Sequence, residues 1–120
     1  MKIQESAENY LETILRLQLR YGSVRAIDIA TELEYSKPSV SVAMKNLRQN
    51  GYIETDPQGH IILLEAGKRI AEDIMECHTI ISGWLESMGV PQDIASDDAC
   101  KLEHVLSAES FEAIKRHIQK

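Results

Sequence analysis

The chain has 120 residues, of which 43% are apolar and 27% charged, and its formal net charge is −6. A chain of this length forms one compact domain or two small ones, which excludes a large enzyme. The mixture of both charge signs with many apolar residues predicts a folded globular protein rather than a disordered one. The negative net charge argues against a uniformly basic nucleic-acid binder.

The charge is unevenly distributed along the chain. Residues 1–60 contain seven basic and eight acidic side chains, whereas residues 61–120 contain six and eleven. Residues 37–50 hold Lys37, Lys45 and Arg48 and no acidic residue. We therefore expect a short basic element that faces phosphate in the first half, and a second half that attracts cations.

The sequence also predicts where the protein acts. The longest aliphatic run is Ile61–Leu64, and the first five residues lack the apolar segment of a secretion signal. These features predict a cytoplasmic protein that does not enter a membrane. Cys77 and Cys100 are too few for a disulfide framework, so we interpret them as a core thiol and a candidate metal ligand.

Three helices are predicted in the first half. The first covers residues 6–21 and ends at Gly22, and its apolar stripe consists of Tyr10, Ile14, Leu17 and Tyr21. Ala26–Leu33 repeats the helical pattern over a shorter stretch. A third helix, Lys37–Gln49, is expected to begin after the N-cap residue Ser36, with Pro38 in its first turn.

A β-hairpin is predicted directly after these helices. Tyr52–Thr55 and His60–Leu63 are short runs rich in strand-forming residues, and they flank the turn-like segment Asp56–Gly59. Three helices and a hairpin in this order predict a winged helix-turn-helix domain over residues 1–63.

The second half is predicted to be helical. From Glu65 to Met88 an apolar seam returns to helical spacing, formed by Ile70, Ile74, Cys77, Ile81, Leu85 and Met88. Such a seam on a long helix is commonly a partner surface. After a break at residues 89–91, further helices are expected over residues 98–106 and 107–119. The fold class is therefore mainly α with a small β-hairpin, and residues 64–120 form a helical dimerisation domain.

The third predicted helix has the properties of a DNA-reading helix. The major groove admits a helix only when its outer face carries side chains that do not collide with the bases, and small polar and basic residues satisfy this condition. The candidate DNA-contacting residues are Arg25, Ser36, Lys37, Pro38, Ser39, Ser41, Lys45 and Arg48. Serine and lysine are also ordinary surface residues, so the prediction depends on the surrounding helix and hairpin topology.

One segment of the acidic half carries three donors suited to a metal ion. Cys100, Glu103 and His104 share a helical face at the i, i+3, i+4 spacing, so a thiolate, a carboxylate and an imidazole converge. Asn9 and Glu12, three residues apart on the first helix, offer oxygen ligands. His78 on the long helix offers a further nitrogen. Taken alone, a Glu-His pair on a helix is usually solvated surface, and a single His or Cys beside an apolar seam is more often a core residue than a ligand.

The chain resembles the diphtheria-toxin-repressor family of iron- and manganese-dependent regulators, in the short form typified by the manganese transport regulator. The resemblance rests on four segments in the same order and spacing, residues 6–14, 24–30, 36–41 and 99–107. It implies a homodimer that binds a palindromic double-stranded DNA operator when metal is bound, represses metal-uptake genes and is not an enzyme. The family's ligand positions fall on Asn9, Glu12, His78, Cys100, Glu103 and His104.

Several of these positions depart from the family pattern. Asn9 stands where manganese regulators usually have Asp and iron regulators have Met, while Glu12 favours the manganese arrangement and Cys100 the iron arrangement. Ser82 and Ser96 replace the Glu and His of the ancillary site in iron-type repressors. The SH3-like third domain of longer members is not expected. The implied metal is Mn²⁺ or Fe²⁺, with Co²⁺ or Zn²⁺ able to bind in vitro.

Three other interpretations remain open at the level of sequence. A winged-helix regulator with a degenerate or purely structural metal site would bind its operator regardless of chelators. An enzyme would use Cys100 or Cys77 as a nucleophile with His104 or His78, although no oxyanion-hole glycine motif accompanies them. A plain interaction module would use only the apolar seam and would leave the basic residues of the third helix without a role.

Overall fold

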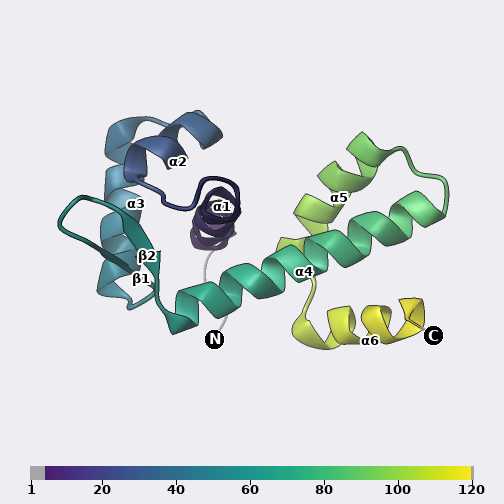
Figure 1. Cartoon of the computed structure of the whole chain (residues 1–120). Coiled ribbons are helices and arrows are strands. Elements are labelled where there is room, and N and C mark those ends of the chain that lie inside the picture. Colours follow the sequence, from purple (N-terminus) through teal and green to yellow (C-terminus); the bar gives the residue numbers. More distant parts are fainter. Residues whose placement is uncertain (1–4, 120) are drawn as a thin grey trace. The chain divides into compact units, whose positions relative to one another are not determined.

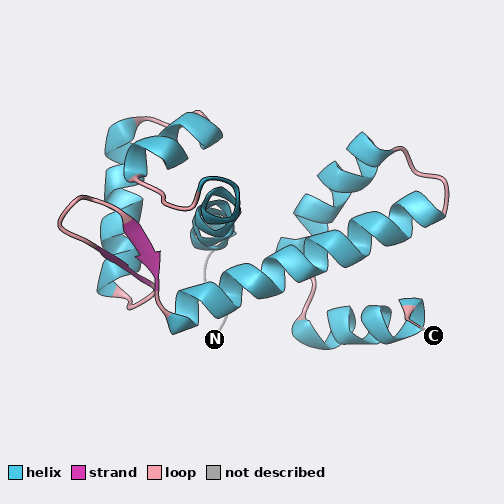
Figure 2. Ribbon diagram, in the orientation of Figure 1, coloured by secondary structure: helices cyan, strands magenta, loops and turns pink. Residues whose placement is uncertain are grey.

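The computed structural model describes residues 5–119, apart from the side chain of Glu5. The prediction about a secretion signal therefore falls almost entirely on residues that lie outside the described range. The chain divides into two compact units, Met1–Glu72 and Asp73–Lys120, and the boundary falls inside the longest helix. The expected fold class, mainly α with a small β-hairpin, is confirmed (Figure 2).

The first unit contains three helices, α1 (Glu5–Tyr21), α2 (Ala26–Leu33) and α3 (Lys37–Gln49), as Figure 1 shows. The fully buried side chains of these helices are aliphatic, Leu11, Ile14, Ile29 and Val40, and Val24 between α1 and α2 is fully buried as well. Tyr21, which we expected on the buried stripe of the first helix, is 67% exposed, so that prediction is wrong. The Arg20 guanidinium lies over its ring instead, 5.7 Å from the centroid.

The hairpin consists of β1 (Ile53–Thr55) and β2 (Ile61–Leu63), which pair antiparallel with Ile53 opposite Leu63. The turn between them is closed by Asp56, whose Oδ1 accepts hydrogen bonds from the backbone N–H groups of Gln58 and His60 at 2.9 and 2.8 Å. No sequence pattern indicates that the segment before α2 joins this sheet. The Ile61 N–H donates to the Val24 carbonyl at 2.7 Å, so the hairpin is attached to the helices by its inner strand.

Close backbone packing attaches the start of α4 (Glu65–Ser87) to the first unit. A Cβ atom added at Gly67 would overlap the carbonyl oxygen of Tyr52 and would lie 3.0 Å from its carbonyl carbon. The same Tyr52 oxygen accepts a hydrogen bond from the Leu64 N–H at 3.0 Å, and the Tyr52 N–H donates to Leu47 at the end of α3. Because only glycine leaves room for this approach, Gly67 sets how the long helix leaves the hairpin.

The second unit packs α5 (Gln92–Val105) and α6 (Ala108–Ile118) against the C-terminal part of α4 (Figure 1). Cys77, Ile81 and Ala99 form its buried centre. The partly buried residues around them are Trp84, Leu85, Leu102, Leu106, Phe111 and Ile114. Part of the seam that we interpreted as a partner surface is therefore covered by the chain's own helices, whereas Met88 at its end is 58% exposed.

The helix expected over residues 98–106 begins earlier than predicted, at Gln92. Pro91 occupies its N-cap position, and Ala95 and Ala99 form its buried stripe. Alanines are small, so the buried face of the first turns carries none of the large apolar residues from which helical periodicity is usually recognised. None of the helices in residues 5–119 is long and apolar enough to cross a membrane.

Candidate metal centre and DNA-reading helix

Three donors converge on one face of α5 in the second unit. The Cys100 sulfur, a Glu103 carboxylate oxygen and a His104 ring nitrogen all lie within 4.8 Å of one another. The predicted helical spacing therefore brings these three residues together. Cys100 is exposed, whereas Glu103 and His104 are buried.

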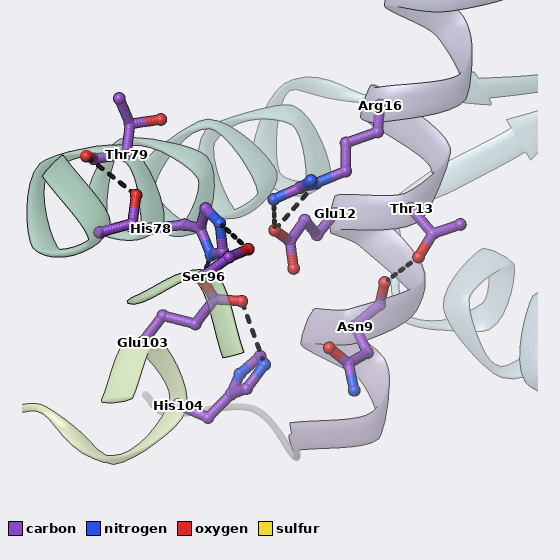
Figure 3. A network of polar contacts seen from close by, with 10 residues as sticks. Asn9, Glu12, Thr13, Arg16, His78, Thr79, Ser96, Glu103 and His104 are labelled. Carbon is purple, nitrogen blue, oxygen red and sulfur yellow. Dashed lines mark hydrogen bonds and ion pairs between the residues drawn. The ribbon is translucent and has the colours of Figure 1, made fainter. Parts of the chain in front are cut away.

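Glu103 lies between two imidazoles, one from its own helix and one from α4 (Figure 3). Its Oε2 is 3.2 Å from His78 Nδ1, and its Oε1 is 3.4 Å from His104 Nε2. The other ring nitrogen of His78 lies 3.4 Å from the hydroxyl of Ser96, which orients the ring. A carboxylate in this position requires positive charge close by, either from a proton on an imidazole or from a cation held between the donors.

The distance from Glu103 to each imidazole suits a pair of donors that bind one metal ion. Donors that bind one ion at about 2.1 Å lie about 3.0 Å apart in an octahedron and about 3.4 Å apart in a tetrahedron. The Glu103 oxygens are separated from the two imidazole nitrogens by 3.2 and 3.4 Å, within that range. Carboxylate, imidazole and thiolate together form a donor set suited to Fe²⁺, Mn²⁺, Co²⁺ or Zn²⁺.

The two oxygen donors predicted in the first unit lie one turn apart on α1. The Asn9 backbone carbonyl accepts a hydrogen bond from the Thr13 hydroxyl at 2.8 Å. Arg16 binds a single oxygen of Glu12, with Nη2 2.6 Å and Nε 3.1 Å from Oε2, as Figure 3 shows. This ion pair was missed in the sequence, although an Arg four residues after a Glu is a recognisable helical pairing.

The predicted reading helix, α3, has the expected two faces. Val40, Met44 and Leu47 are buried, and the helix contains no acidic residue. Its N-cap is Ser36, whose hydroxyl oxygen accepts a hydrogen bond from the Ser39 N–H at 3.3 Å. All eight of the predicted DNA-contacting residues are exposed: Arg25, Ser36, Lys37, Pro38, Ser39, Ser41, Lys45 and Arg48.

Two of these eight residues occupy more specific positions than we predicted. The Arg48 guanidinium donates to the Thr55 hydroxyl at 3.3 Å, which links the end of α3 to β1. Arg25 lies at the N-cap of α2, where its backbone N–H donates to the Asp28 carboxylate at 2.9 Å. Arg48 therefore has a structural contact in addition to any contact with phosphate.

Three residues that were not predicted also lie on the outer face of α3. Val42, Asn46 and Gln49 are exposed, and Val42 reaches 61%. Their positions follow from the helical rotation of about 100° per residue away from the buried Val40 and Met44. The signal that identifies them is this angle rather than residue type, because the prediction included only small polar and basic side chains.

Comparison with known proteins agrees with this architecture. Residues 2–61 match the family model of the iron dependent repressor N-terminal DNA binding domain. Residues 64–120 match the model of the iron dependent repressor metal binding and dimerisation domain. Together the two models account for nearly the whole chain.

Individual relatives are transcriptional regulators. The chain is 33% identical to the transcriptional regulator MntR of Escherichia coli O6:H1 over 98% of its own length and 76% of the relative. It is also 33% identical to a helix-turn-helix regulator of Methanocaldococcus jannaschii, covering 98% of this chain and 96% of that one. Among solved structures, the manganese regulator SloR has a TM-score of 0.81 at 25% identity, over 94% of this chain and 53% of that chain. The chain therefore belongs to the iron-dependent repressor family of metal-dependent transcriptional regulators.

Proposed function

We propose that the protein is a repressor of metal-uptake genes that binds a palindromic DNA operator as a homodimer in response to Mn²⁺ or Fe²⁺. Membership of a family with a DNA-binding domain and a metal-binding and dimerisation domain supports the general function. We further propose that these functions divide at residues 1–63 and 64–120, and the matched ranges, 2–61 and 64–120, support this division.

The observation that carries the proposal is the position of Glu103 between His78 and His104. A divalent ion bound there supplies the positive charge that the carboxylate requires. Cys100 adds a thiolate from the same face of α5. We assign the remaining ligand positions to Asn9 and Glu12 on α1, and this assignment rests on the family resemblance.

These ligand residues are proposed to couple metal binding to DNA binding. When donors from α1, α4 and α5 bind the same ion, they stabilise the protein conformation that brings them together. Metal binding therefore selects that conformation. In a dimer, the two α3 helices then lie at a separation that matches successive major grooves, a multiple of about 34 Å. By linkage, the conformation that binds metal more tightly also binds the operator more tightly.

The donor set restricts the metal without selecting a single ion. Carboxylate and amide oxygens suit Mn²⁺ and Fe²⁺, whereas the Cys100 thiolate favours Fe²⁺, Co²⁺ or Zn²⁺. Ser82 donates to the Thr79 carbonyl at 3.3 Å, and Ser96 contacts His78. Both serine hydroxyls therefore have partners within the protein, and we do not assign them as ligands of a second ion.

A direct test combines metal titration with operator binding. The full chain is stripped with chelator, titrated with Mn²⁺, Fe²⁺ and Mg²⁺, and assayed for retardation of DNA from its own promoter region. We expect retardation with Mn²⁺ or Fe²⁺, none with Mg²⁺, and release when chelator is added. Retardation that persists unchanged in chelator would instead favour a regulator with a purely structural metal site.

The two cysteines are predicted to differ in reactivity. Burial, followed by the nearby Glu103 and Glu76 carboxylates, raises the pKa of the Cys77 thiol to about 11, so about one thiol in a thousand is ionised at pH 8. Cys100 is exposed. Iodoacetamide at pH 8 is therefore expected to alkylate Cys100 and spare Cys77, as peptide mass spectrometry would report.

Metal provides a second arm of the same experiment. A thiolate that coordinates an ion is a poor nucleophile, so Mn²⁺ or Fe²⁺ should slow alkylation of Cys100. Protein unfolded in urea is the control, because both cysteines should then react at similar rates. Alkylation of Cys100 at an unchanged rate in saturating metal would remove it from the ligand set.

A further inference from the structure

An exposed valine stands in the middle of the DNA-reading face of α3. Val42 is 61% exposed, although it lies on a helix whose other aliphatic residues, Val40 and Leu47, are buried. Two residues of helix rotate by about 200°, so Val42 points away from the side on which Val40 and Met44 are buried. A β-branched residue on an exposed helical surface is a poorer helix former than alanine. The stability of the helix therefore does not explain why valine stands at this position.

The surroundings of Val42 indicate what it contacts. Ser39 and Lys45 lie three residues before and after it, and Pro38 and Asn46 lie four residues before and after it, so all four adjoin it on the helix surface. All four are exposed. The polar and basic neighbours Ser39, Lys45 and Asn46 suit phosphates and base edges, whereas the side chains of Pro38 and Val42 have no hydrogen-bonding group.

We propose that Val42 reads thymine by contact with its C5-methyl group. This inference rests on the proposed function, since it assumes that α3 enters the major groove of the operator. Among the four bases, only thymine presents an apolar group in that groove. Lys37 and Lys45, on a helix without acidic residues, provide the positive charge that holds this face against DNA. The operator should therefore contain a thymine at a fixed position in each half-site.

The test uses the full chain with Mn²⁺ and a library of randomised DNA duplexes, from which bound sequences are selected. In the selected site, each thymine of one half-site is replaced in turn by uracil, which removes only the 5-methyl group. We expect one replacement to weaken binding about fivefold, which corresponds to about 1 kcal/mol. The Val42→Ala substitution should weaken binding to the thymine duplex by a similar factor. The variant should then bind the thymine and uracil duplexes with equal affinity.

Two further variants serve as controls. Leu19→Ala removes an equally exposed aliphatic side chain, 71% exposed on α1, and should keep the fivefold preference for thymine. Val42→Thr keeps one methyl group of the side chain and should retain part of the preference for thymine over uracil. The inference is overturned if Val42→Ala keeps the preference for thymine, or if the wild-type protein shows no such preference at any position of the site. In either case the proposed function stands. Failure to select any sequence in the presence of metal overturns both.

Discussion

Glu103→Gln is expected to abolish metal-dependent operator binding and to leave the fold intact. The substitution keeps the shape of the side chain and removes the charge that lies between His78 and His104. An uncharged amide is a weak ligand, so we expect the affinity for Mn²⁺ or Fe²⁺ to fall by about 100-fold or more. Calorimetric titration measures this loss, and electrophoretic retardation measures the loss of DNA binding.

Stability measurements separate the loss of a ligand from damage to the fold. Wild-type protein at a metal concentration 100 times the dissociation constant should gain about 2.7 kcal/mol in its free energy of unfolding. Glu103→Gln should lose this gain. Without metal, the variant should still unfold in one cooperative transition, because glutamine keeps the shape of the side chain.

Glu112→Gln is the matched control for this substitution. Glu112 is exposed on α6 of the same unit, so its replacement makes the same change in net charge without touching the candidate donors. It should bind metal and DNA like the wild type. If Glu103→Gln is stabilised by metal as strongly as Glu112→Gln, Glu103 is not a ligand and the proposed metal centre is wrong.

The parts of the fold that were predicted correctly carry strong local signals. The bounds of α2 and α3 agree with the expected Ala26–Leu33 and Lys37–Gln49. For α3 the reason is visible, because the Ser36 hydroxyl caps the helix as predicted. The start of α5 was missed because its buried face begins with alanines, and the attachment of Val24 to β2 was missed because it joins segments far apart in the sequence.

The same distinction applies to the candidate metal centre. Cys100, Glu103 and His104 lie in one helix, so their spacing alone predicts that they share a face. No periodicity indicates that α4 would bring His78 to within 3.2 Å of Glu103. The residue type made His78 a candidate nitrogen donor, and the family resemblance placed it at a ligand position. Neither the ion pair of Arg16 with Glu12 nor the position of Val42 on the outer face of α3 was predicted, because the prediction considered only metal donors and polar groups.

Gly67→Ala is expected to destabilise the first unit, against the usual effect of this substitution in a helix. Alanine is ordinarily the better helix former by about 0.8–1 kcal/mol. At position 67 its Cβ would overlap the Tyr52 carbonyl oxygen and would lie 3.2 Å from the Tyr52 Cβ. Because the contact is largely with backbone, the helix and the hairpin must move apart. Such overpacking should lower the free energy of unfolding by about 1–3 kcal/mol.

Gly83→Ala on the same helix is the control that isolates this contact. A Cβ atom at Gly83 would meet nothing within 4 Å, so only the helix propensity changes and the free energy of unfolding should rise by about 0.5–1 kcal/mol. Urea denaturation of the two variants should therefore give shifts of opposite sign. Shifts of the same sign would show that the Tyr52 carbonyl moves without cost, and Gly67 would then not determine how α4 leaves the hairpin. With opposite signs, Gly67→Ala should also weaken operator binding in saturating metal, because the hairpin and α3 are connected to α4 through Tyr52.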